Sequence, residues 1–141
     1  MPNDEPLWIP FDAVVEINRD AVAVTGEPFH LMQPNLLDSA LAVPKNKYEY
    51  GGERDVFTLA VSLLLAIARN HAFFQGNKRT AFIAAHDFLQ SNGYQLDIPD
   101  SEYLVLLVIK GVESEISEST LEQTLRGYIV ESPEHDVEGF V

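Results

Sequence analysis

The stretch from Val56 to Arg69 constrains the fold more than any other part of the chain. Its 14 residues are apolar on almost every side when they are placed on a helix, and Asp55 precedes them as a cap. A helix of this kind is stable only when other elements cover it, and it is too short for a membrane span of about 18 residues. The sequence therefore predicts a buried central helix, and it contains no segment that reads as a membrane span.

The remaining segments are predicted to surround this helix. Apolar residues at helical spacing, caps and stop signals indicate helices over Pro10–Val24, Asn35–Leu41, Lys78–Ser91 and Tyr103–Lys110, and one more from Ser119. Pro44 is expected to stop the second of them, and the polar Lys45–Gly52 segment is expected to form an exposed β-hairpin or flap. The pattern predicts an all-α bundle with one short β excursion: a single domain over residues 1–130 and a mobile acidic tail over 131–141.

The charge balance excludes several classes of function. The chain carries 9 Lys and Arg against 22 Asp and Glu, a formal net charge of −13. Such a protein does not hold nucleic acid or an anionic membrane by bulk charge, because phosphate binding needs Lys and Arg. Cysteine is absent, which excludes thiolate ligands and a cysteine nucleophile. The acidic N-terminus has no apolar core behind it, so we expect a cytoplasmic location.

The placement of the charges is more informative than their sum. All 22 acids lie outside residues 56–86, and these 31 residues contain Arg69, Lys78 and Arg79. A buried helix explains the missing carboxylates by itself, since acids are scarce in cores. It explains less well why two adjacent cations follow Gly76-Asn77. A site for a phosphate group at the start of a helix accounts for both observations.

The start of the predicted fourth helix has the components of an anion site. A helix start presents backbone N–H groups without intrahelical partners, together with the positive end of the helix dipole. Gly76 allows close approach of a ligand, and Asn77 suits the N-cap position and is a neutral donor. Lys78 and Arg79 supply full positive charges for phosphate oxygens.

His71 stands seven residues before Lys78 and is the titrating group suited to act as a general base near neutral pH. Phe73 is expected to bury its ring and to anchor the loop. Together these residues fit phosphoryl or nucleotidyl transfer. Taken singly, each has a plainer interpretation: a histidine at a helix end is more often a cap, and Gly-Asn is usually a turn.

The segment also resembles a known family. The run His71-x-Phe73-x-x-Gly76-Asn77-Lys78-Arg79-Thr80 is similar to the Fic/Doc motif, and Lys78 in place of glycine is similar to its Doc (death-on-curing) branch. The resemblance extends to Leu36–Pro44 and Phe88–Tyr94 and covers roughly residues 8–130. It implies a Fic/Doc-type helical bundle with a short β-hairpin flap.

The resemblance also implies roles for individual residues. His71 would activate a protein hydroxyl, and the nucleotide, ATP with Mg²⁺, would be held by Gly76, Asn77, Lys78 and Arg79. Lys47, Tyr48 and Tyr50 would belong to a flap that positions the target segment. Fic enzymes mostly transfer AMP, whereas Doc toxins phosphorylate a translation elongation factor and are paired with a Phd-type antitoxin.

Two positions depart from the family pattern. Gln75 replaces the acid that binds Mg²⁺ in most members, and a neutral amide oxygen holds the ion more weakly. The ATP phosphates would then supply most metal ligands, or activity would be reduced, or the protein would bind a nucleotide or partner without turnover. Phe82 stands where AMP-transferring members have a further arginine, which favours phosphate transfer. The inhibitory segment of some Fic proteins has no counterpart here, since Glu134 lies four residues before Glu138-Gly139, so a separate antitoxin is expected.

Overall fold

The structure, a computed structural model, describes residues 5–97, 112–113 and 116–131. Its helices and strands follow one another as α1 (Phe11–Val24), α2 (Pro34–Glu49), α3 (Val56–Asn70), α4 (Asn77–Ser91), β1 (Tyr94–Leu96), α6 (Glu118–Arg126) and β2 (Ile129–Glu131). The predicted all-α class is confirmed. The helix expected over Tyr103–Lys110 lies outside the described residues.

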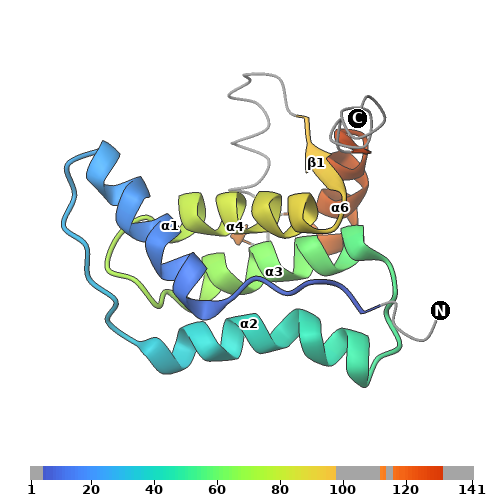
Figure 1. Cartoon of the computed structure of the whole chain (residues 1–141), viewed down its shortest axis with the longest axis horizontal. Helices are drawn as coiled ribbons and strands as arrows, with labels where there is room; N and C mark the ends of the chain where they lie inside the picture. The colour runs from blue at the N-terminus through green and yellow to red at the C-terminus, as the bar shows by residue number, and fades with distance from the viewer. Residues whose placement is uncertain (1–4, 98–111, 114–115, 132–141) are drawn as a thin grey trace, which may run out of the picture.

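Helix α3 forms the centre of the bundle, as its apolar sequence predicts. Ten consecutive residues, Leu59 to Ala68, are buried. The carboxylate of Asp55 caps the helix, since its Oδ1 accepts a hydrogen bond of 2.9 Å from the backbone N–H of Phe57. Figure 1 shows α3 between α2 and α4, with α1 crossing α4 near its start. All four helices therefore contribute to one core, which also includes residues of α6.

The bundle places the end of α3 beside the start of α4. The two helices are antiparallel and joined by the six residues 71–76, so this loop lies at one end of the molecule. The same end holds the start of α2, because Asn70 Nδ2 donates a hydrogen bond of 2.8 Å to the carbonyl of Leu36. The end of α1 is also there, through contacts of Arg79 with the carbonyl of Ala21.

The prediction that Pro44 ends the second helix is wrong. Helix α2 continues through Pro44 to Glu49, although a proline inside a helix loses one backbone hydrogen bond and costs about 3 kcal/mol. Contacts of the last turn offset part of this cost. The ring of Tyr48 packs edge-on against Trp8 at a centroid distance of 5.9 Å, and Lys47 Nζ pairs with Glu118 Oε2 at 3.1 Å.

The β-hairpin expected at Lys45–Gly52 is also absent, because α2 occupies most of that segment. The small antiparallel sheet of the fold lies elsewhere and joins β1 to β2, with Tyr94 opposite Glu131. Glu131, expected in the mobile tail, is thus part of a strand; the rest of the tail lies outside the described residues.

The last described helix begins slightly earlier than predicted. Ser117, not Ser119, is its N-cap, since Ser117 Oγ accepts a hydrogen bond of 3.0 Å from Thr120 N–H. No helix in the described part of the chain is both long enough and apolar enough to cross a membrane.

Candidate functional site

The loop between α3 and α4 is held in one shape by its own side chains. Phe73 is 1% exposed and packs in the core, as predicted. The side chain of Asn77 closes on the backbone of Phe73: its Oδ1 accepts from the Phe73 N–H at 3.1 Å, and its Nδ2 donates to the Phe73 carbonyl at 2.8 Å. The side-chain amide of Asn77 therefore fixes the loop through both its oxygen and its nitrogen.

A second segment, residues 30–33, borders the loop. Leu31 and Phe73 form an antiparallel β-bridge, and the Phe74 N–H donates to the carbonyl of His30 at 2.9 Å. Met32 and Phe74, which flank this bridge, are both exposed. Sequence reasoning missed this segment, because a single bridge leaves no strand pattern in the sequence.

Gly76, not Asn77, is the N-cap of α4, so that part of the prediction is wrong. Gly76 has a positive φ of 76°, and a Cβ there would lie 3.1 Å from Val22 Cγ1 and 3.2 Å from Asn18 Nδ2. The positive φ thus favours glycine, and a larger residue would also crowd these two side chains. Among the described residues, none accepts a hydrogen bond from the backbone N–H groups of Gly76, Asn77 and Lys78, so these groups are available to a ligand.

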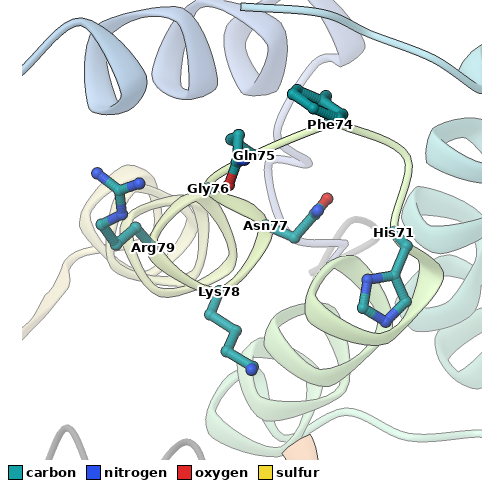
Figure 2. A pocket seen from close by; sticks show the side chains of 7 residues that line it. All are labelled: His71, Phe74, Gln75, Gly76, Asn77, Lys78 and Arg79. Atoms are coloured by element: carbon teal, nitrogen blue, oxygen red, sulfur yellow. The ribbon is translucent and has the colours of Figure 1, made fainter. Parts of the chain in front are cut away.

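These N–H groups border a pocket of about 250 Å³ (Figure 2). It is lined by His71, Phe74, Gln75, Gly76, Asn77, Lys78 and Arg79. The pocket is smaller than the roughly 300–1,000 Å³ of sites that enclose a whole small molecule. It therefore suits the phosphate groups of a ligand, with the remainder of the ligand outside.

The structure brings His71 and Lys78 to this pocket with their side chains free. Both are exposed, and among the described residues neither side chain makes a hydrogen bond or ion pair. His71 is the C-cap of α3 and adopts φ 52° and ψ 45°. It is the one non-glycine residue with positive φ in the described part of the chain, a conformation that costs roughly 1–2 kcal/mol. This backbone conformation places the imidazole at the edge of the pocket.

Arg79 also lines the pocket, but its guanidinium is turned to the end of α1. Nη1 donates to the carbonyl of Ala21 at 2.9 Å and to Thr25 Oγ1 at 3.2 Å, and Nη2 pairs with Glu27 Oε1 at 2.5 Å. Figure 2 shows Arg79 on one side of the α4 start and His71 on the other. Hydrogen bonds from the Thr25 hydroxyl and from Arg79 lower the pKa of Glu27 below its ordinary value of 4.5. The ion pair is thus intact at neutral pH.

The described residues do not form a resident metal site. No cluster of three His, Asp or Glu side chains suited to a metal ion occurs among them, and the pocket lining contains no carboxylate. Gln75 offers the remaining amide oxygen, because Asn77 Oδ1 is engaged with Phe73. One neutral oxygen is a weak ligand set for Mg²⁺.

The residues expected to position the target are not brought to the pocket. Lys47, Tyr48 and Tyr50 lie at the end of α2, which runs antiparallel to α3 (Figure 1). The length of α3, 15 residues or about 22 Å, separates that end from the loop. Lys47 is paired with Glu118 and Tyr48 is packed against Trp8, while Tyr50 is 84% exposed.

The fold and this loop define a protein of the Fic/Doc family. The model of the Fic/DOC family matches residues 8–89, which is more than half of the chain, and the chain belongs to that family. It is 47% identical over 81 residues to Toxin Doc of Mycolicibacterium smegmatis, an alignment that covers 57% of this chain and 62% of that protein. It is 33% identical over 96 residues to Protein kinase doc of Escherichia phage P1, covering 68% of this chain and 75% of that protein.

Proposed function

We propose that the protein is a Doc-type toxin that transfers a phosphoryl group from ATP to a Ser or Thr hydroxyl of a cytoplasmic protein. The observation that carries the proposal is one pocket in which His71, Lys78 and the first N–H groups of α4 have no partner among the residues that the structure describes. The histidine is a general base, and the helix start with its lysine binds phosphate. The names of the two relatives, a toxin and a protein kinase, support this choice.

In the proposed reaction the target hydroxyl attacks the γ-phosphorus of ATP. The hydroxyl oxygen forms the new P–O bond, its proton passes to a ring nitrogen of His71, and the bond from the γ-phosphorus to the bridging oxygen breaks. ADP leaves with that electron pair. The N–H groups of Gly76, Asn77 and Lys78, with the Lys78 ammonium, stabilise charge on the phosphate oxygens.

Phosphoryl transfer is favoured over AMP transfer by Phe82. Its ring is partly buried against the core on α4 and offers no donor for phosphate. The resemblance to the family implies an arginine at this position in members that transfer AMP. Mg²⁺ enters the proposal as part of the MgATP substrate, to which Gln75 would contribute one neutral oxygen ligand.

The target and the partner are proposed from the resemblance to Doc. The target is a protein of the translation machinery such as an elongation factor, and the partner is a Phd-like antitoxin that covers the pocket. Residues 30–33, which border the loop, are the better candidates for aligning the target than Lys47, Tyr48 and Tyr50. Growth arrest on expression that is relieved by co-expression of a neighbouring small reading frame supports this partner. Arrest that no neighbouring frame relieves contradicts it.

The two transfer chemistries are separated by isotope-labelled ATP. A bacterial lysate is incubated with the protein and with ATP labelled at either the α- or the γ-phosphate. Label on a protein from γ-labelled ATP alone is the expected result. Label from α-labelled ATP would show AMP transfer and contradict the proposal.

A second candidate is a protein that binds a nucleotide without turnover. The absence of a carboxylate from the pocket lining favours it, because a tightly held Mg²⁺ ordinarily aids phosphoryl transfer. ATP binding without label transfer from either phosphate would select this candidate.

A further inference from the structure

Asn18 is a buried polar residue on α1 that lies directly behind the loop. Its side chain is 0% exposed. Its Nδ2 donates to the carbonyl of Gln75 at 2.8 Å and to Thr80 Oγ1 at 3.0 Å. A Cβ added to Gly76 would lie 3.2 Å from the same nitrogen. Asn18 thus touches the turn that leads into α4 and the first turn of that helix.

The other end of the Asn18 amide is unsatisfied. Its Oδ1 is the buried side-chain atom that lacks a hydrogen-bond partner in the described part of the chain. A buried acceptor without a partner lowers stability, and the neighbouring buried positions of α1 are Val14, Ala21 and Val22. An apolar residue would remove that penalty. Core packing alone therefore does not explain an asparagine at this position, whereas the hydrogen bonds donated by its Nδ2 do.

The bond to Gln75 fixes the orientation of one peptide group. The peptide between Gln75 and Gly76 is trans, so its carbonyl and its N–H point in opposite directions. Asn18 holds the carbonyl toward α1, and the N–H of Gly76 is consequently turned away from α1. Figure 2 shows α1 on one side of the Gly76 turn and the side chains of Lys78 and His71 on the other.

We propose that Asn18 is a positioning residue for phosphate: by holding the Gln75 carbonyl against α1, it keeps the Gly76 N–H directed into the pocket. The inference rests on the proposed function of that pocket. Without the Asn18 donor the peptide can rotate, and a carbonyl oxygen would then face the phosphate in place of an N–H. The partial negative charge of that oxygen would repel the phosphate oxygens.

The variants that test this role are Asn18→Ala and Asn18→Asp. The first removes the amide; the second keeps the side-chain shape and replaces the donor by an acceptor. Thr80→Val is the matched control, because Thr80 is equally buried and shares the network, yet its loss leaves the bond from Asn18 to Gln75 in place. Circular dichroism identifies which variants keep the native helices, and either Asn18 variant suffices for the test.

The readouts are the dissociation constant for ATP and the amide resonance of Gly76 in ¹⁵N-labelled full-length protein. We expect ATP to shift the Gly76 amide proton in the wild type and in Thr80→Val, with affinities within about twofold of each other. We expect the Asn18 variants to bind roughly tenfold more weakly, the effect of one hydrogen bond to a charged group, and to lose the Gly76 shift.

Two results would overturn this inference and leave the proposed function of the pocket standing. One is an Asn18 variant that binds ATP and shifts Gly76 as the wild type does. The other is a Thr80→Val variant as weak as the Asn18 variants, which would make the whole buried network, not the Gln75 bond, responsible. A wild type that does not bind ATP would instead overturn the proposed function, and the role of Asn18 with it.

Discussion

The carboxylate of Glu27 and the guanidinium of Arg79 form an ion pair between the segment that follows α1 and the first turn of α4. Arg79 belongs to the acid-free stretch 56–86, and Glu27 lies outside it. The folded chain therefore brings an acid to a site that is free of acids along the sequence. A phosphate that binds Arg79 has to compete with this carboxylate, and Lys78 is the cation at the pocket that needs no release.

Removing this competition should strengthen phosphate binding. We expect Glu27→Gln to bind ATP about threefold more tightly, because the variant lacks one solvent-exposed negative charge near the phosphate. We expect this gain in affinity to decrease as the salt concentration rises. Titration calorimetry measures it. Glu16→Gln is the matched control, since Glu16 is on α1 and pairs with Arg19 away from the pocket. An equal gain in that control would mean that net charge alone is responsible.

The ion pair should also respond to acid in a defined direction. The pKa of Glu27 is lowered in the folded protein, so the pair contributes to stability above the ordinary pKa of 4.5 and is lost as the pH falls through the lower folded value. We expect the ¹³C resonance of the Glu27 carboxyl to titrate below pH 4.5 in the wild type. In Thr25→Val, which lacks the hydroxyl donor, the midpoint should rise. An unchanged midpoint would contradict the assigned cause.

His71 allows activity to be separated from backbone strain. We expect both His71→Asn and His71→Gly to abolish transfer, because neither residue can take the proton of the target hydroxyl. Asn and Gly tolerate a positive φ, and Gly relieves the strain, so His71→Gly should raise the free energy of unfolding by about 1 kcal/mol. Urea unfolding and the labelled-ATP assay check the two effects. Full transfer by His71→Asn would remove the general-base role.

In the proposed function, Gln75 is the pocket residue that would contribute a ligand to the nucleotide's Mg²⁺. Gln75→Asp adds a charged oxygen to the pocket lining, so we expect a lower Mg²⁺ concentration at half-maximal transfer. Gln90→Asp makes the same charge change at the other end of α4 and should leave the Mg²⁺ dependence as it is. Equal Mg²⁺ dependence in wild type and Gln75→Asp would show that Gln75 does not face the metal.

Two glycines with nearly the same φ separate conformational strain from crowding. Gly26 has φ 72° with no atom near an added Cβ, whereas at Gly76, with φ 76°, a Cβ would crowd Val22 and Asn18. We expect Gly26→Ala to cost about 1 kcal/mol of stability from strain alone. Gly76→Ala should cost more and should also weaken ATP binding. Equal decreases in melting temperature for the two variants would mean that Val22 and Asn18 can move aside for the added Cβ.

The parts of the structure that were predictable from sequence depend on local patterns. The apolar run of α3, its Asp55 cap and the buried anchor Phe73 are each encoded within a few residues, and all are confirmed. The end of α2 was not predictable in this way. Its proline signals a stop, and the turn beyond it contacts Trp8 and Glu118, which are distant in the sequence and leave no local signal there.

The same distinction holds for the site. The loop sequence places His71, Gly76 and Lys78 together because they are near one another in the chain. Asn18 of α1 contacts Gln75 of the loop across 57 residues, and Glu27, which follows α1, contacts Arg79 of α4 across 52 residues. Neither residue has a local signal that marks it. Only the packing of α1 on α4 brings them to the site.

In the proposed function, His71 accepts the proton of a protein hydroxyl as that hydroxyl takes a phosphoryl group from ATP. Mass spectrometry of a lysate incubated with the protein and MgATP tests it most directly, with His71→Asn as the inactive control. We expect one target protein to gain a phosphoryl group on Ser or Thr with the wild type and not with the variant. Gain of AMP, no gain on any protein, or an equal gain with His71→Asn would contradict it.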